Sequence, residues 1–142
     1  MQTRCSVVLV LLVISAFWWL TPVRGEVVGE FTRVVNQVEQ LKQGKEPAFP
    51  GKVFNGVANQ DQLRTKEQSM AVVHFVDEST MTVSPKSKVT IEEYMYDANK
   101  DRAMGTIKIM EGVVETVIPS TEKLQQKDLQ IRTTTAVAGI RG

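Results

Sequence analysis

Short runs of alternating apolar and polar residues recur from residue 70 onward, and this period of two is typical of β-strands. In MAVVHFV, Ala71, Val73 and Phe75 alternate with residues 72, 74 and 76, so both faces of one strand can be apolar. Residues 26–142 contain 16 valines and 11 threonines, whose branched side chains fit a pleated sheet better than a helix. We therefore predict a nearly all-β fold for this part of the chain.

Polar turns divide the runs into short strands, and they fall at residues 77–79, 85–87, 111–112 and 119. The last run, DLQIRTTTAVAGI, places Leu129, Ile131 and Thr133 on one face of a further strand.

The segment from residue 28 to residue 42 has two readings. Phe31, Val34, Val38 and Leu41 recur at helical spacing, which indicates an amphipathic helix. Asn36-Gln37 is equally suited to a hairpin turn between two strands. The pattern alone leaves both open.

Residues 1–25 have the layout of a secretory signal peptide. A short basic start is followed by the apolar run from Ser6 to Leu20, then by Pro22 and small or β-branched residues up to Gly25. The run is shorter than the ~20 residues that a membrane-spanning helix needs. We expect cleavage after Gly25 and export to the periplasm or the outside of the cell; an uncleaved membrane tether is the alternative.

Charge and cysteine content exclude some classes of protein. Cleavage after Gly25 would change the formal net charge from +1 to −1, which does not suit a nucleic-acid partner. Cys5 is the only cysteine, and it precedes the apolar run, whereas a lipidated cysteine would follow it. The exported domain is therefore expected to lack disulfides.

The sequence indicates no metal site and no cofactor. Asp97, Asn99 and Asp101 match the first, third and fifth positions of an EF-hand loop. Arg102 stands where that loop needs glycine, and Lys108 where it needs the closing glutamate. A solvated hairpin tip is the better interpretation.

Catalysis is the least favoured function. His74 is the only histidine, and a catalytic histidine needs an orienting acid and a nucleophile beside it. Glu92 and Glu93 are adjacent, and adjacent residues of a regular strand point to opposite faces. We therefore predict that the protein is not an enzyme.

Tyr94 and Tyr96 are the candidate ligand-binding residues. Their spacing of two places them on one strand face, where they could stack against a glycan or another small ligand. Packing against a neighbouring strand is the alternative role.

Five segments resemble the FecR domain, the family named after the regulator of ferric citrate transport. In chain order they are VGEFTRV, QDQLRT, VHFVDESTMTVSPKSKVTIEEYMYD, IMEGVVETVIP and IRTTTAVAGIRG. The resemblance implies a twisted β-solenoid or β-roll of short strands, and it favours a strand pair for residues 28–42. It also implies that the pattern continues past Gly142, so that the domain over residues 26–142 is expected to be incomplete at its end.

Two turns depart from the family pattern. The family has Gly-Asp where this chain has Gln60-Asp61, and Asp-Gly-Ser where it has residues 77–79, DES. Because glycine readily adopts positive φ, its absence predicts either another turn type or a strained turn.

The resemblance implies a signalling module of the bacterial cell envelope. Only four residues, MQTR, precede Cys5 and the apolar run, so we expect no cytoplasmic anti-sigma segment. The predicted function is binding of another envelope protein through a strand edge or a rung face, and the alternative is recognition of a glycan or small ligand.

Overall fold

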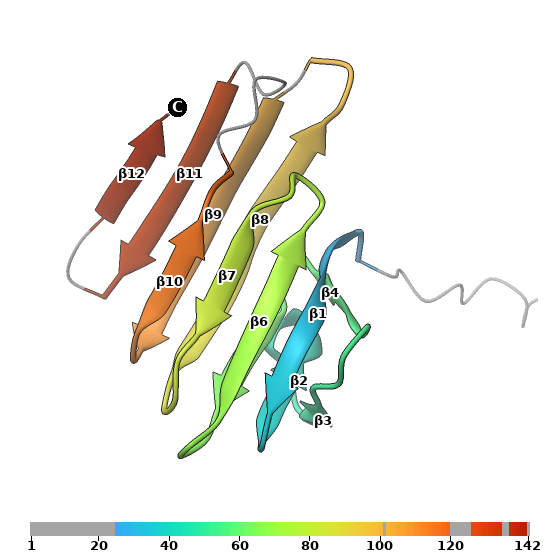
Figure 1. Cartoon of the computed structure of the whole chain (residues 1–142), viewed down its shortest axis with the longest axis vertical. Coiled ribbons are helices and arrows are strands. Elements are labelled where there is room, and N and C mark those ends of the chain that lie inside the picture. Colours follow the sequence, from blue (N-terminus) through green and yellow to red (C-terminus); the bar gives the residue numbers. More distant parts are fainter. Residues whose placement is uncertain (1–24, 101, 120–125, 135–136, 142) are drawn as a thin grey trace, which may run out of the picture.

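The computed structural model describes residues 25–100, 102–119, 126–134 and 137–141. These residues form two β-sheets that lie face to face (Figure 1). The strands are β1 (Val27–Val35), β2 (Val38–Leu41), β3 (Phe49–Pro50), β4 (Gly56–Ala58), β5 (Gln62–Thr65), β6 (Met70–Phe75), β7 (Thr80–Val83), β8 (Lys88–Asp97), β9 (Arg102–Glu111), β10 (Val114–Val117), β11 (Gln126–Thr133) and β12 (Val137–Arg141). A 3-10 turn, η2 (Lys42–Gly44), follows β2.

The sheets have five and seven strands, and both are open. Their orders are β10-β7-β6-β1-β4 and β12-β11-β9-β8-β5-β2-β3. The prediction of an all-β fold is confirmed, as are the strands and turns expected between residues 70 and 119. The arrangement does not show a solenoid or β-roll in particular.

The hydrophobic core lies between the two sheets. Phe75 of β6 stacks on Tyr94 of β8, with ring centroids 4.4 Å apart and ring planes inclined by 10°. Each sheet contributes fully buried aliphatic side chains at alternate positions, as the period of two requires. These include Val73, Met81, Val83, Leu63, Val89, Ile91 and Ile107.

Residues 28–42 form two strands, so the strand interpretation is confirmed and the helix is wrong. The hairpin is also wrong, because β1 and β2 belong to different sheets. β1 pairs with β4 and β6, whereas β2 pairs with β3 and β5. Asn36, at φ 56°, turns the chain from one sheet to the other. The spacing of Phe31, Val38 and Leu41 that resembled a helix arises because the two sheets bury them from opposite sides of one core.

A bulge interrupts β8. The register with β9 shifts between Ile91 and Glu93, so that Glu92 is an extra residue. Ile91 and Tyr94 are therefore both buried, although they are three residues apart.

The two turns that lack the family's glycine are strained, as predicted. Glu78 has φ 67° and Gln60 has φ 69°, the left-handed region that glycine adopts most easily. The neighbouring residues explain why the turn at Glu78 forms. The Asp77 carboxylate accepts hydrogen bonds from the backbone N–H and the hydroxyl of Ser79, at 3.0 and 2.7 Å.

The predicted signal segment lies almost wholly outside the described residues, as do Cys5 and Asp101. Within the described ranges, no helix has the length and apolar character needed to cross a membrane.

Candidate functional site

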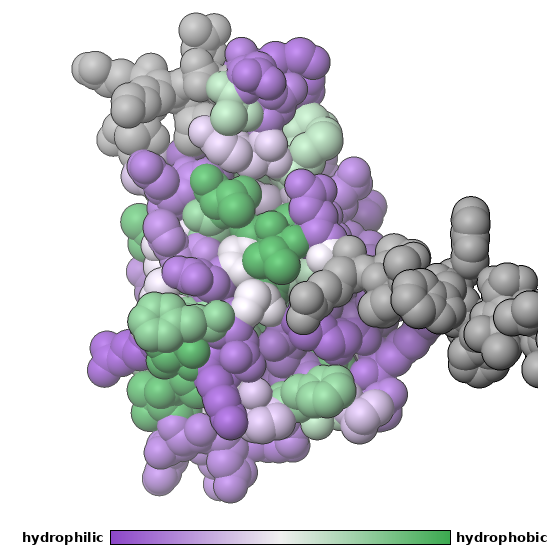
Figure 2. Space-filling view, turned by 90° about the vertical axis from the view of Figure 1, so that its right-hand side faces the viewer, coloured by the Kyte–Doolittle hydropathy of each residue, from purple (hydrophilic) through white to green (hydrophobic). Residues whose placement is uncertain are grey.

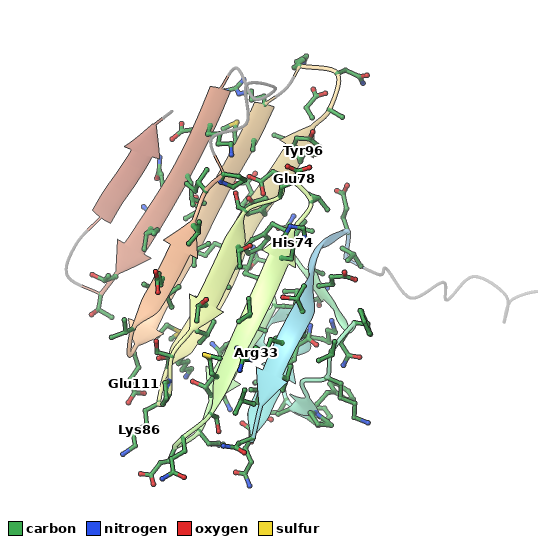
Figure 3. All side chains as sticks on the ribbon, viewed as in Figure 1. Arg33, His74, Glu78, Lys86, Tyr96 and Glu111 are labelled. Carbon is green, nitrogen blue, oxygen red and sulfur yellow. The ribbon has the colours of Figure 1, made fainter. Side chains whose placement is uncertain are left out.

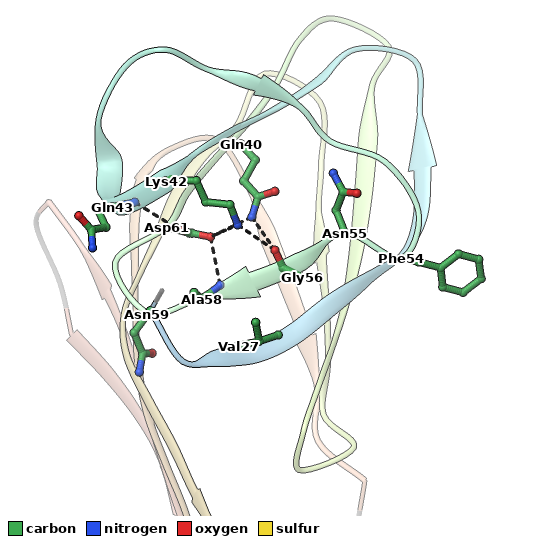
Figure 4. Close-up of a pocket in the computed structure, with 11 residues that line it drawn as sticks. Val27, Gln40, Lys42, Gln43, Phe54, Asn55, Gly56, Ala58, Asn59 and Asp61 are labelled. Atoms are coloured by element: carbon green, nitrogen blue, oxygen red, sulfur yellow. Dashed lines mark hydrogen bonds and ion pairs between the residues drawn. The ribbon is translucent and has the colours of Figure 1, made fainter. Parts of the chain in front are cut away.

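A hollow of about 690 Å³ opens at one side of the molecule, between the β1–β4 pair of one sheet and β2 of the other (Figure 4). Its lining is mixed, and includes the Lys42 ammonium, the Asp61 carboxylate, four amide side chains and the ring of Phe54. The full lining is Gly25, Val27, Gln40, Lys42, Gln43, Phe54, Asn55, Gly56, Ala58, Asn59 and Asp61.

Asp61 organises the floor of this hollow. Its side chain is 1% exposed, and its Oδ2 accepts hydrogen bonds from Gln40 Nε2, Lys42 Nζ and the Ala58 backbone N–H, at 2.8, 2.9 and 3.0 Å. Its Oδ1 accepts one from the backbone N–H of Gln43, at 3.0 Å. A buried carboxylate requires such partners, and the Lys42 cation compensates its charge.

The carbonyl of Gly56 joins the same network. It accepts hydrogen bonds from Gln40 Nε2 and Lys42 Nζ, both at 2.9 Å. The network therefore connects β2 and the turn η2 to β4 of the other sheet. It fixes the positions of the polar side chains that line the hollow.

Phe54 lies at the rim of the hollow. Its ring is 79% exposed and projects away from the Asp61 network (Figure 4). The backbone is held by hydrogen bonds to Phe31, from Phe54 N to Phe31 O at 2.8 Å and from Phe31 N to Asn55 O at 3.1 Å. The φ of Phe54 is 68°, a conformation that bulky residues rarely adopt.

Sequence reasoning missed this site. Asp61 was noted only as part of a turn, and Gln40, Lys42 and Phe54 were not singled out. No short spacing links these residues, because Lys42 and Asp61 meet only through the antiparallel pairing of β2 with β5, in which Leu41 lies opposite Gln62. Viewed from the side on which β1 and β4 lie, the surface is largely hydrophilic, with separate apolar patches (Figure 2).

Tyr94 and Tyr96 do not form a stacking platform. Tyr94 is 3% exposed and stacks on Phe75 in the core, so its packing role is the one the structure shows. Tyr96 is 37% exposed, near the end of β8 that approaches the Glu78 turn (Figure 3). The sequence left two roles open for these tyrosines, ligand stacking or packing against a neighbouring strand, and the bulge at Glu92 places Tyr94 on the core side. A ligand contact by Tyr96 alone stays a prediction.

Burial raises the pKa of Tyr94 well above its usual value. The hydrogen bond to Asp77 and the negative charge of that residue raise the pKa further, whereas the hydrogen bond with Ser79 lowers it. The phenol is thus held in its neutral form, which suits a structural group in a core.

His74 stands on the outer face of the five-stranded sheet (Figure 3). Its cross-strand neighbours are Glu30 of β1 and Thr80 of β7, an acid and a hydroxyl on either side of the imidazole. No hydrogen bond joins these three described side chains, and His74 lines none of the hollows described here.

The glutamate pair is separated by its contacts. Glu92 approaches Lys108 and Arg132, at 3.9 and 3.6 Å, whereas Glu93 is exposed. At the EF-hand-like turn, Asp97 Oδ1 accepts a hydrogen bond from the Asn99 backbone N–H at 3.0 Å, which is an ordinary turn contact. Within the described residues, no group of three or more His, Cys, Asp or Glu is placed to hold a metal.

The edge strand β10 is a second candidate site. Among the described strands it pairs with β7 alone, in the register Val114↔Val83 to Val117↔Thr80. Ser84 N donates to Val113 O at 3.1 Å, which makes residues 113, 115 and 117 the hydrogen-bonded positions of this antiparallel pair. The backbone groups of residues 114 and 116 therefore point away from β7, toward the open edge.

A family model described as "FecR protein" matches residues 61–142 of the chain, more than half of its length. The match begins at Asp61 and takes in β5 to β12, so the hollow lies mostly before it and β10 lies within it. No curated protein and no solved structure shows a significant match.

Proposed function

Because the chain belongs to the FecR protein family, we propose that it is an exported, non-enzymatic signalling module of the bacterial cell envelope, which binds a partner protein by strand addition at β10. The family suggests a regulatory envelope module. The open edge of β10 is the observation that carries the binding mode.

The geometry of β10 suits an added strand. The N–H and C=O groups of residues 114 and 116 have no partner among the described residues, and they form a short row at the edge of the sheet. Val113 and Val117, which are 65% and 58% exposed, flank this row with apolar side chains. An extended peptide could pair with the backbone and cover both valines.

Export and the absence of catalysis belong to the same proposal. The signal-like layout of residues 1–25 supports export. The surroundings of His74 support a binding role over a catalytic one. Its neighbours Glu30 and Thr80 are not hydrogen-bonded to it, and the three residues line none of the described hollows, whereas a catalytic histidine needs such partners beside a substrate site. Turnover of an envelope polymer by the purified protein would contradict this part.

Proline at residue 116 tests the binding mode. Thr116→Pro removes an outward N–H without removing a bond to β7, so the fold should persist and partner binding should fall at least tenfold. We would measure photo-cross-linking from residue 117 to its envelope partner in the native host, with circular dichroism as the check on folding.

Thr116→Val is the matched control. It keeps the N–H, and it removes a buried hydroxyl that has no hydrogen-bond partner, so binding and stability should be retained. Equal cross-linking by Thr116→Pro and Thr116→Val would show that the edge of β10 is not the binding surface.

A further inference from the structure

We propose that the hollow beside Asp61 is a binding site for an uncharged carbohydrate, with Phe54 as the ring against which a sugar packs. This site is separate from the proposed protein-binding edge, because β4 and β10 lie at opposite ends of the five-stranded sheet. All lining residues except Asp61 precede the part of the chain that matches the family model.

The charges in the hollow favour a neutral ligand. Lys42 and Asp61 are the only charged side chains that line it within the described structure, and they are paired at 2.9 Å. Asp61 already accepts four hydrogen bonds, so it offers little to a cation. The Asp61 carboxylate compensates the Lys42 charge, so the hollow has no unpaired positive charge to attract an anionic ligand.

The remaining polar groups suit hydroxyls. Lys42 Nζ makes two hydrogen bonds and has a third N–H to donate. Gln43 and Asn55 carry amides that both donate and accept, as sugar hydroxyls do. The volume of about 690 Å³ lies within the ~300–1,000 Å³ that small-molecule sites occupy.

Phe54 supplies the apolar surface that a sugar ring can cover. An exposed phenylalanine in the left-handed region costs free energy twice, since its backbone is strained and its ring is in water. Such outliers gather at ligand sites, where the local cost is offset by a function. Because this ring projects away from Lys42 at the rim, one sugar would pack its C–H face on Phe54, and the next sugar of the same oligosaccharide would occupy the hollow beside Lys42 and the amides.

The test uses the full chain and three neutral oligosaccharides, namely maltohexaose, cellohexaose and tri-N-acetylchitotriose, with hexagalacturonate as the anionic comparison. We expect at least one neutral oligosaccharide to bind in isothermal titration and the anionic one to bind more weakly. Phe54→Ala should weaken binding at least tenfold, and Phe54→Tyr, which keeps a ring, should restore it to within about threefold.

Phe49→Ala is the matched control, because Phe49 is also an exposed phenylalanine, 49% exposed on β3, and does not line the hollow. It should leave the affinity unchanged. Failure of the wild-type protein to bind any neutral oligosaccharide, preference for hexagalacturonate, or equal loss in both alanine variants would each overturn the proposal. Thr116→Pro should leave sugar binding intact, so the two functions fail separately.

Discussion

At the scale of single residues, Glu78 is held in a conformation that glycine would adopt with less strain. Its φ of 67° lies in the left-handed region, and the turn around it is fixed by Asp77 and Ser79. Glu78→Gly should raise the free energy of unfolding by about 0.5–1 kcal/mol, the relief of strain less the added flexibility of the unfolded chain. Urea unfolding followed by circular dichroism measures this.

Glu78→Ala is the control for that change, since alanine removes the carboxylate but meets the same backbone strain. It should give no comparable gain. A glycine variant no more stable than the alanine variant would show that the turn carries no strain.

At the scale of strands, the sequence indicated most of the elements but not how they are shared between the sheets. The period of two located β6, β7 and β8, because each buries alternate residues of one face. It could not assign β1 and β2 to different sheets. A hairpin within one sheet and a crossing between two sheets would bury the same residues. It also could not place the bulge at Glu92. In a strand rich in both polar and aromatic side chains, one extra residue does not visibly interrupt the alternation of apolar and polar positions.

The candidate sites depend on these unpredicted features. The sequence left the role of Tyr94 open between ligand stacking and packing, and the bulge at Glu92 places its ring in the core. The contact of Lys42 with Asp61 follows from the antiparallel pairing of β2 with β5, which sets Leu41 opposite Gln62 and brings the next residue of each segment together. Local patterns contain neither piece of information.

The packing of β9 against β8 leads to a prediction for Gly105. A Cβ at this position would lie 2.6 Å from Tyr94 Cδ2 and 3.1 Å from Leu129 Cδ1. The Tyr94 ring cannot retreat, because Phe75 stacks on it. Gly105→Ala should therefore lower the free energy of unfolding by about 1–3 kcal/mol, the usual effect of overpacking.

A double-mutant cycle with Tyr94→Leu identifies the cause. If the clash is with the ring, Gly105→Ala should cost clearly less in the Tyr94→Leu background, as measured by urea unfolding. Equal costs in both backgrounds would place the strain elsewhere.

At the scale of the whole molecule, Tyr94 makes stability depend on alkaline pH. Its pKa in the folded protein is raised, first by burial and then by Asp77, above the unfolded value of 10.0. Stabilisation of the neutral phenol is thus fully present below pH ~10 and is lost above it, because the unfolded chain releases its proton first. The free energy of unfolding should fall there by up to ~1.4 kcal/mol per pH unit.

Comparison of variants isolates this contribution from that of the lysines. Tyr94→Phe should show a shallower decline than the wild-type protein between pH 10 and 11.5, whereas Tyr96→Phe should decline as the wild type does. Identical slopes for all three proteins, measured by urea unfolding, would rule out Tyr94 as the source.

The position of β1 also has a mechanical consequence. This strand follows directly on the segment before Val27, yet it lies inside its sheet, hydrogen-bonded to β6 on one side and to β4 on the other. A pull applied through that segment would act along the strand and would shear both sets of hydrogen bonds together, rather than peel them one by one. The domain is therefore built to resist tension from its amino-terminal side.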